Sequence, residues 1–364
     1  MVWCWQLPDW PKFKYDIHAL NDYEKTFHHN AGRLTGAIHH LEKENTDILK
    51  VELLVQEALS TSSIEGEILN RDSVQSSIRK HLNLKTDGRR VPPNAAGISE
   101  MMVDLYLNFS MPLNHTQLYR WHAMLMNGRR DIESIGTYRS HKEPMQIISG
   151  NLTNPTIFYE APPSERIKKE MNSFVKWYEI NLINKEMPTL LLAGIAHIYF
   201  EMIHPFEDGN GRIGRALVEK VISQRLKSPA LNSLAKVIEK NKKEYYQSIY
   251  QCNTSLDLQS YLEYFCKIII DAQNYTYDLV HFLILKSKYF YRFQYKLNER
   301  QAKVLLRILD EGIEGFKGGL NAQKYQAISG ASPATTTRDL QELVDLKALK
   351  RTGELKGTRY WPIL

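Results

Sequence analysis

Residues 204–215 read HPFEDGNGRIGR, and this is the most informative stretch of the chain for its fold and function. The apolar run that precedes it, residues 188–203 (PTLLLAGIAHIYFEMI), predicts a buried helix. After it, apolar residues recur at helical spacing in residues 213–224 (IGRALVEKVISQ), which predicts a second helix that begins near Gly211 or Arg212. The glycine-rich segment between them is therefore expected to form a turn that joins two helices.

The residue types within this stretch suit the binding of phosphate groups. Glycines permit positive φ angles, and a helix start offers unpaired N–H groups and the positive end of its dipole. Arg212 and Arg215 lie three residues apart on one helical face, and each can fork onto phosphate oxygens. Asp208 supplies the hard oxygen that Mg²⁺ takes beside phosphates, and His204 is the natural proton acceptor near neutral pH. The stretch predicts a site that holds a polyphosphate and removes a proton next to it.

At every fixed position the stretch matches the signature of the Fic family, His-x-Phe-x-Asp/Glu-Gly-Asn-Gly-Arg-x-x-Arg. The resemblance implies a mainly α-helical catalytic domain with a β-hairpin flap. It also implies an enzyme that transfers AMP from ATP to a Ser, Thr or Tyr hydroxyl of a protein, or of itself. His204 would deprotonate that hydroxyl, which attacks the α-phosphate as pyrophosphate leaves, and Asp208 would hold Mg²⁺. The resemblance assigns nucleotide binding to Gly209, Asn210, Gly211, Arg212, Ile213, Gly214 and Arg215.

Gly211 bears on the type of reaction. One branch of the family carries Lys at this position and uses the nucleotide as a phosphate donor. The glycine in this chain therefore favours transfer of AMP over transfer of phosphate.

A second part of the chain resembles the inhibitory motif of Fic enzymes, Ser/Thr-x-x-x-Glu-Gly/Asn. Residues 47–69 show helical apolar spacing and contain Thr-Ser-Ser-Ile-Glu-Gly at positions 61–66. Thr61 and Glu65 lie four residues apart, so they are expected to share a helix face. The resemblance implies that Glu65 pairs with Arg215. An arginine committed to a carboxylate cannot also bind the γ-phosphate, so the site would be autoinhibited.

Two weaker segments complete the expected site. The β-prone residues 145–149 and 156–159 flank a loop that starts with Gly150-Asn151, and they predict a hairpin. By resemblance this hairpin is the flap that pairs with the backbone of the target protein. Residues 241–246 (NKKEYY) resemble the segment that borders adenine, which marks Asn241 and Tyr246 as candidate purine contacts. A surface helix with packed tyrosines is the alternative.

Composition bounds the class of protein. The chain has 364 residues, of which 43% are hydrophobic and 24% charged, and these are the proportions of an ordinary soluble globular protein. Its three cysteines are widely spaced, which favours reduced thiols and a cytoplasmic location. The N-terminus lacks the pattern of a secretion signal, and no apolar run reaches membrane-spanning length, so a membrane partner is not expected.

We expect four regions along the chain. Residues 1–83 form a helical extension that carries the inhibitory helix, and residues 94–275 form the catalytic domain. A helical linker covers residues 276–297, and residues 298–364 form a C-terminal domain. The family resemblance covers most of the first 275 residues.

The C-terminal region predicts three helices and then a β-ribbon, the order of a winged helix-turn-helix. The helix entered by Ser332-Pro333 would be the recognition helix, and it would present Thr335, Thr336, Thr337 and Arg338 to a groove. Residues 296–364 hold 12 Lys/Arg against 8 Asp/Glu, an excess too small to decide for DNA. Winged helices also dock proteins or form homodimers.

Two classes of function therefore remain open from the sequence. The first is a Mg²⁺-dependent adenylyltransferase that modifies a protein and is restrained by Glu65. The second is a DNA-binding regulator whose nucleotide site senses rather than catalyses.

Overall fold

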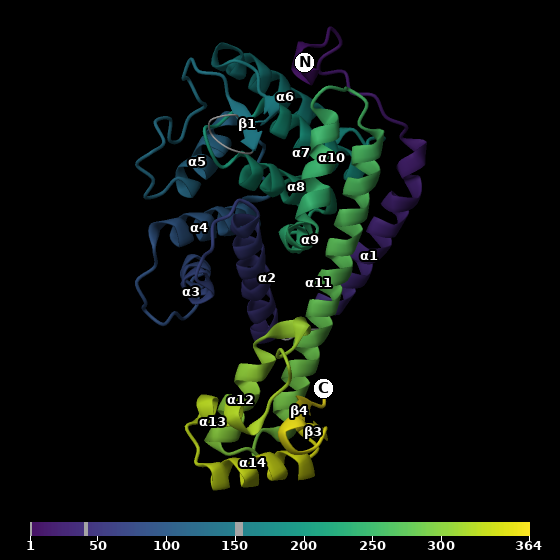
Figure 1. Ribbon diagram of the computed structural model, residues 1–364. Helices are drawn as coiled ribbons and strands as arrows, with labels where there is room; N and C mark the ends of the chain where they lie inside the picture. Colours follow the sequence, from purple (N-terminus) through teal and green to yellow (C-terminus); the bar gives the residue numbers. More distant parts are fainter. Residues whose placement is uncertain (1, 40–42, 150–155) are drawn as a thin grey trace. The chain divides into compact units, whose positions relative to one another are not determined.

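The protein is mainly helical, and the computed structural model describes residues 2–39, 43–149 and 156–364 (Figure 1). Two compact units divide the chain. The first comprises residues 1–35 and 50–276, and the second comprises residues 36–49 and 277–364. Of the helices in the described ranges, none combines the length and apolar character that a membrane crossing needs.

The α-helices follow one another with short connections. They are α1 (Asn21–His39), α2 (Lys43–Ile64), α3 (Arg71–His81), α4 (Pro93–Asn108), α5 (His115–Leu125), α6 (Ser164–Ile183), α7 (Thr189–Ile203), α8 (Asn210–Leu226), α9 (Leu234–Lys240), α10 (Lys242–Cys252), α11 (Gln259–Phe293), α12 (Glu299–Leu309), α13 (Ala322–Ser329) and α14 (Pro333–Asp345). Short 3₁₀ turns lie at Cys4–Gln6, His18–Leu20, Gly312–Glu314 and Leu355–Gly357. The segment expected as a linker is mostly the C-terminal part of the long α11.

Helices α7 and α8 form the centre of the first unit and pack against each other. Every residue of α7 except Glu201 is buried, as its apolar sequence predicts. The carboxylate of Glu24, on α1, accepts hydrogen bonds from the first two backbone N–H groups of α7, those of Thr189 and Leu190, at 2.7 and 2.9 Å. A carboxylate at this end of a helix satisfies unpaired N–H groups and complements the helix dipole. A buried apolar helix is thus fixed at its start, and its other end carries the catalytic candidate His204.

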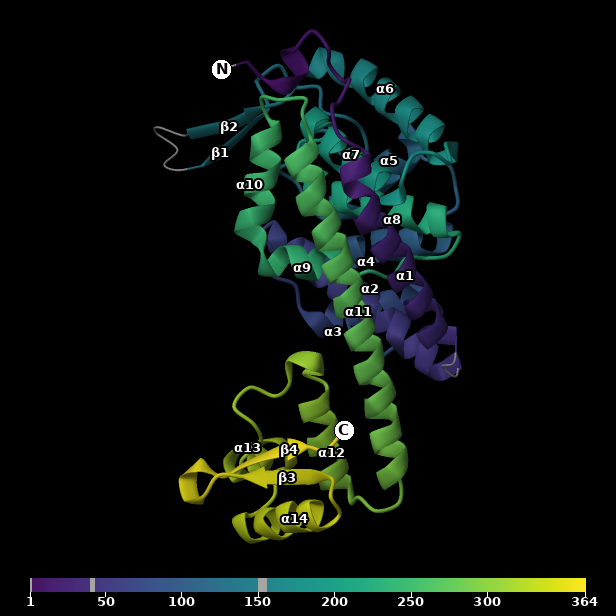
Figure 2. The ribbon, with the colours of Figure 1, turned by 90° about the vertical axis from the view of Figure 1, so that its right-hand side faces the viewer.

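The predicted hairpin is present in the first unit. Strand β1 (Gln146–Ser149) pairs antiparallel with β2 (Thr156–Glu160), with a register irregularity after Ile147. Figure 2 shows the hairpin beside α10. The expected turn at Gly150-Asn151 lies outside the described residues. The hairpin is tied to the core at its base, where Tyr159 is buried and its hydroxyl donates to the Met202 carbonyl.

The second unit has its own apolar core and contains helices α12 to α14, followed by strands β3 (Leu349–Thr352) and β4 (Arg359–Pro362). The two strands pair antiparallel (Figure 2). Three helices followed by a ribbon is the order that the sequence predicts here. One side-chain prediction is wrong: Thr336 does not face outward but is fully buried. It lies three and four residues before Asp339 and Leu340, which are also buried, and so shares the inner face of α14 with them.

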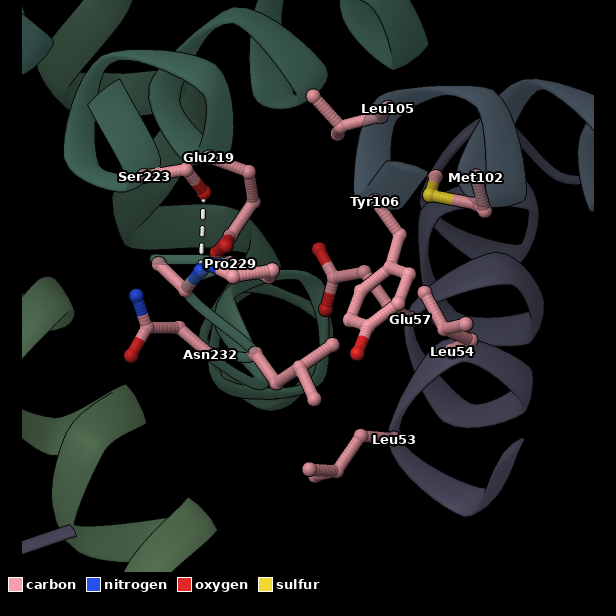
Figure 3. A pocket seen from close by; sticks show the side chains of 12 residues that line it. Leu53, Leu54, Glu57, Met102, Leu105, Tyr106, Glu219, Ser223, Pro229 and Asn232 are labelled. Atoms are coloured by element: carbon pink, nitrogen blue, oxygen red, sulfur yellow. Dashed lines mark hydrogen bonds between the residues drawn. The ribbon is translucent and has the colours of Figure 1, made fainter. Parts of the chain in front are cut away.

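Two carboxyl groups are buried where α2 approaches α8. Glu57 and Glu219 are 6% and 5% exposed and line a cavity of about 30 Å³, which Figure 3 shows from close by. Both oxygens of Glu57 accept from the backbone N–H of Ala235, whereas neither oxygen of Glu219 has a hydrogen-bond partner. Burial raises the pKa of Glu57 to about 8 and, together with the nearby Glu57, raises that of Glu219 well above 4.5. Burial and the neighbouring Glu57 therefore favour the protonated form of Glu219 in the folded protein.

A Glu219→Gln protein is expected to unfold at a higher temperature than the wild type at pH 8. Above pH 4.5 the unfolded chain ionises Glu219 more readily than the folded chain, whose pKa for this group is raised, so Glu219 lowers stability as the pH rises. Glutamine keeps the shape and cannot ionise. We expect a gain in Tm of about 2–4 °C, the effect of roughly 1 kcal/mol, which shrinks toward pH 5. Thermal unfolding between pH 5 and 8 measures this gain in Tm, and substitution of the exposed Glu186 by Gln is the control. A difference in Tm between Glu219→Gln and wild type that does not change with pH would contradict the raised pKa of Glu219.

Candidate active site

The loop between α7 and α8 is held in an unusual backbone conformation. Helix α7 ends at Ile203. Its C-cap residue, His204, adopts the left-handed region with φ 49° and ψ 59°, and Pro205 follows. Gly209, with φ 84°, then precedes α8. Helix α8 begins at Asn210, slightly before the predicted start, because the Asn210 side chain closes the turn through bonds to the backbone N–H and carbonyl of Phe206.

The start of α8 is open to an anion. No side chain caps it, since Gly209 occupies the N-cap position. Unpaired N–H groups and the helix dipole together attract negative charge at such a helix end. The φ of 84° at Gly209 favours glycine, and a Cβ there would make a tight contact, 3.1 Å from Met126 Cε. The loop is therefore a cradle made of backbone, as the sequence predicts.

His204 is positioned by Arg139, a buried residue outside the loop. The Arg139 side chain donates from Nε to the His204 carbonyl at 2.8 Å, and its backbone N–H donates to the Pro205 carbonyl at 3.0 Å. The imidazole is half-buried, and its Nδ1 is enclosed without a hydrogen-bond partner. Burial and the nearby Arg139 charge lower the pKa of His204 to about 4. The ring is therefore neutral at pH 7 and able to accept a proton.

Phe206 anchors the loop to the hydrophobic core. It is fully buried, and its ring stacks on that of His122 with centroids 4.2 Å apart. His122 accepts the backbone N–H of Gly136 at Nδ1, and burial lowers the pKa of its imidazole to about 4. This histidine is a packed core residue, and no sequence pattern indicated its partner.

Arg215 lies against the segment that the sequence predicts to be inhibitory. Its Nε donates to Thr61 Oγ1 at 2.7 Å, and its Nη2 donates to the Thr61 carbonyl at 2.9 Å and to Glu65 Oε1 at 2.7 Å. Glu65 thus contacts the arginine with which it was predicted to pair, and Thr61, the other residue of the motif, contacts the same arginine. Helix α2 ends at Ile64, so Glu65 lies in the turn after the helix rather than on its face. Gly211 leaves room for this carboxylate, since a Cβ there would lie 2.3 Å from Glu65 Oε1.

Asp208 and Arg212 belong to a chain of ion pairs. Arg212 Nη2 donates to Asp208 Oδ1 at 3.1 Å, and its Nη1 donates to Glu67 Oε2 at 3.0 Å. Arg129, after α5, donates to the other oxygen of Asp208 at 2.7 Å. Burial opposes ionisation of Asp208, yet Arg212 and Arg129 hold the pKa of its carboxyl below the usual value. Sequence reasoning missed Arg129, Glu67 and the role of Arg139, because each lies far along the chain from the loop.

The side chains of the loop are of the types that would bind Mg²⁺ and a nucleotide. Asp208 offers carboxylate oxygens, the ligand type that Mg²⁺ prefers, and the Nε of the buried Arg212 has no partner. The described residues contain no cluster of three or more His, Cys, Asp or Glu side chains suited to a metal. A metal at Asp208 would therefore rely on phosphate oxygens and water for its other ligands, and it would compete with Arg129 and Arg212.

A cavity of about 530 Å³ lies between the hairpin, the end of α7 and α10. Its lining residues include Ile147, Ile148, Phe158, Tyr159, Glu201, Met202, Lys243, Tyr246, Gln247, Ile249, Tyr250 and Asn253. Tyr246, a predicted purine contact, is thus at this cavity. Asn241, the other one, does not line it, and its amide donates instead to the Val237 carbonyl because it ends α9.

The remaining predicted nucleotide residues support the loop. Ile213 is fully buried, and its N–H donates to the Gly209 carbonyl. Gly214 leaves room for Glu201, whose Oε1 would lie 2.5 Å from a Cβ at that position. Burial, with a further contribution from Glu65, raises the pKa of Glu201 to about 8. Glu201 is therefore a neutral acid beside the arginine cluster.

Comparison with known proteins agrees with this geometry. A family model described as "Fic/DOC family" matches residues 112–222, which include α5 to most of α8 and the whole loop. The chain carries a Fic domain. A second model, described as "Domain of unknown function (DUF4172)", matches residues 3–84, which precede the Fic domain and contain Thr61, Glu65 and Glu67.

Two curated relatives resemble part of this chain. One is the protein adenylyltransferase Fic of Nematostella vectensis, 28% identical over 118 residues, which are 31% of this chain and 25% of the relative. The other is a probable protein adenylyltransferase of Aquifex aeolicus, 28% identical over 95 residues, 25% of each chain. The matched stretch thus spans only a quarter of the length of either relative.

Solved structures show that the fold extends further. A Fic family protein from Desulfovibrio desulfuricans is similar over 97% of this chain and 98% of its own, with 20% identity and a TM-score of 0.58. A Fic domain containing signaling protein from Bacteroides thetaiotaomicron covers 69% of this chain and 96% of its own, with 18% identity and a TM-score of 0.51. At this identity the likeness establishes the Fic fold alone.

Proposed function

We propose that this Fic protein is an adenylyltransferase that moves AMP from ATP to a hydroxyl side chain of a protein, or of itself. One observation carries the proposal. The neutral imidazole of His204 lies in the loop that leads into the uncapped start of α8, and Arg212 and Arg215 belong to the first turns of that helix. A base beside an anion cradle is what such a transfer requires. The relatives named as protein adenylyltransferases support this choice of reaction.

The reaction needs few protein groups. The target hydroxyl loses its proton to His204, and its oxygen forms a bond to the α-phosphorus. The bond between the α-phosphorus and the oxygen that bridges to the β-phosphate breaks, and pyrophosphate leaves with that electron pair. Arg212 and Arg215 would neutralise the charge that moves onto the leaving group, which is the main contribution that proteins make to phosphoryl-type transfer.

Mg²⁺ would be held by Asp208 and by phosphate oxygens of the nucleotide. When bound, it screens the charges of the phosphates and polarises them toward attack. Asp208 must exchange its contacts with Arg129 and Arg212 before it can take this role. The arginines that leave Asp208 are then free to meet the phosphates.

The target protein would be held by the hairpin. Strands β1 and β2 pair only with each other among the described strands, so the outer edge of β1 can pair with an extended segment of another chain. The edge of β2 is already engaged at the Phe158 carbonyl, which accepts from the Asn253 amide. Ile147, Ile148 and Ile157 are each about two-fifths exposed, which gives the hairpin an apolar surface. Backbone pairing of this kind would present a target hydroxyl near His204 without strict selection of the target sequence.

Labelled ATP tests the proposed reaction. The protein is incubated with Mg²⁺ and ATP labelled either in the α- or in the γ-phosphate, with and without cell lysate. Transfer of AMP places the α-label on protein and leaves the γ-label in pyrophosphate. Protein that is labelled only from the γ-phosphate would show transfer of phosphate and contradict transfer of AMP. If no variant becomes labelled, the site would bind a nucleotide as a sensor without catalysis.

The second unit supports an additional candidate function, binding of double-stranded DNA. Arg338 on α14 and Lys350, Arg351 and Lys356 on the ribbon are exposed, and none of the ion pairs in the described ranges involves them. Unpaired cations on a helix and an adjacent ribbon suit phosphate contacts in the arrangement of a winged helix. If the second unit binds DNA, the protein would combine a nucleotide site and a DNA-binding unit in one chain.

We expect that an Arg338→Ala protein binds duplex DNA about 5- to 150-fold more weakly than the wild type, the range that corresponds to a lost arginine contact of about 1–3 kcal/mol. Affinity should also fall steeply with salt. Fluorescence anisotropy with a labelled duplex at several salt concentrations measures both, and Lys303→Ala on α12 is the control. Equal, salt-independent binding by all three proteins would exclude this surface and favour protein docking.

A further inference from the structure

The segment that follows α2 carries two carboxylates that reach two different arginines of the loop. Glu65 Oε1 lies 2.7 Å from Arg215 Nη2, and Glu67 Oε2 lies 3.0 Å from Arg212 Nη1. Gly66, with φ 84°, turns the chain between them, and the Glu67 N–H donates to the Ser62 carbonyl at 3.0 Å. One short turn, anchored to the end of α2, therefore engages both guanidinium groups.

Glu67 is held from both sides. Its Oε1 accepts from Asn94 Nδ2 at 2.8 Å, while its Oε2 accepts from Arg212. Asn94 belongs to the first turn of α4, so the carboxylate is fixed between that helix and the loop. The Arg212 side chain is only 6% exposed, and the Glu67 side chain 30%. A partly buried, charge-assisted pair of this kind is stronger than an ion pair on the open surface.

The carboxylates reverse the charge of the phosphate site. Three arginines meet there, Arg129, Arg212 and Arg215, but four carboxylates pair with them: Glu65, Glu67, Asp131 and Asp208. The net charge of this cluster is −1, which repels a triphosphate. Without Glu65 and Glu67 the same cluster carries a net charge of +1. Removal of either glutamate alone brings the net charge of the cluster to zero, so each loss is expected to favour the nucleotide.

We propose that Glu67 is a second inhibitory residue, which holds Arg212 as Glu65 holds Arg215. The proposal rests on the proposed function for its consequence in catalysis, but not for its effect on binding. Both terminal nitrogens of Arg212 are engaged, by Glu67 and by Asp208, and only the buried Nε has no partner. The guanidinium cannot fork onto a β-phosphate in this arrangement. Displacement of Glu67 frees Nη1 for that contact.

The two inhibitory contacts are coupled by the chain. A single residue, Gly66, separates the glutamates, so a movement that withdraws one also shifts the other. Removal of Glu65 alone frees Arg215 but leaves Arg212 held by Glu67. The effects of the two substitutions on nucleotide affinity are therefore expected to be non-additive, as they are for residues that share one network.

Binding of the stable analogue α,β-methylene-ATP with Mg²⁺ to the full chain, measured by calorimetry, tests the proposal without requiring catalysis. Glu67→Gln keeps the size and the contact with Asn94 but removes the charge. We expect this protein to bind the analogue about tenfold tighter, which corresponds to 1.4 kcal/mol. Binding of AMP, which has no β-phosphate, should change little. Glu52→Gln is the matched control, because Glu52 lies on α2 and pairs with Arg71 away from the loop.

Each outcome decides the question. Equal affinity of Glu67→Gln and wild type for the analogue, or an equal gain for AMP, would overturn the proposal. If Glu67→Gln does not fold, Asn94→Ala removes the other support of Glu67 and should tighten the analogue by a smaller factor; no gain there overturns it as well. Tighter binding with no AMP transfer in any variant would leave the inhibitory role standing and remove the proposed function instead.

Discussion

The Glu65→Gly protein is expected to transfer AMP at least about tenfold faster than the wild type, a factor that corresponds to a competing contact of about 1.4 kcal/mol. Arg215 is almost fully buried, and Glu65 is the carboxylate that its Nη2 reaches. Without this carboxylate, Arg215 Nη2 keeps its hydrogen bond to the Thr61 carbonyl, and a phosphate oxygen can accept the bond that Glu65 accepted. The rate at which the α-label of ATP enters protein measures the effect.

The same substitution has a cost in stability that provides a control. A buried arginine that loses its carboxylate destabilises the fold, because an uncompensated charge remains. The Tm of Glu65→Gly without nucleotide should therefore fall below that of the wild type and recover with Mg²⁺ and ATP. Glu65→Gln, which keeps the shape, separates charge from bulk. Unchanged labelling in a folded Glu65→Gly protein would show that Glu65 does not restrain the site.

Substitution of His204 is expected to reduce transfer by a factor of about 10²–10⁴, the usual contribution of a general base, and to leave nucleotide binding nearly intact. The imidazole is the neutral, proton-accepting group in the loop, whereas the anion cradle is made by the start of α8 and the arginines. The experiment is best made in the active Glu65→Gly background. Single-turnover labelling gives the rate, and calorimetry with the ATP analogue gives the affinity.

The choice of substitution matters because His204 has φ 49°. Alanine is strained at positive φ, whereas asparagine tolerates this region. His204→Asn therefore removes the base while it keeps the loop, and His204→Ala adds backbone strain. Loss of transfer in both proteins, with binding kept in His204→Asn, supports a chemical role. Transfer at the original rate in His204→Asn would remove His204 as the base.

Much of the fold and of the loop could be predicted from the sequence. The buried α7, the following α8 and the hairpin strands occur where apolar spacing and turn residues place them. The Glu65 contact with Arg215 was also expected, although only through the resemblance to Fic enzymes. The prediction that failed concerns a single side chain. Thr336 faces inward, and periodicity alone could not distinguish this orientation. Asn241 ends α9 and does not line the cavity at Tyr246, and its purine contact stays a prediction.

The sequence by itself determined the anion loop, because backbone conformation there depends on glycines, a proline and helix ends that are neighbours in the chain. Tertiary structure alone decided the electrostatic state of that loop. Arg139, Arg129 and Glu67 reach it from 65, 79 and 145 residues away, and burial lowers the pKa of His204. Charge interactions depend on distance in space and on exclusion of water, and neither quantity is written in local sequence.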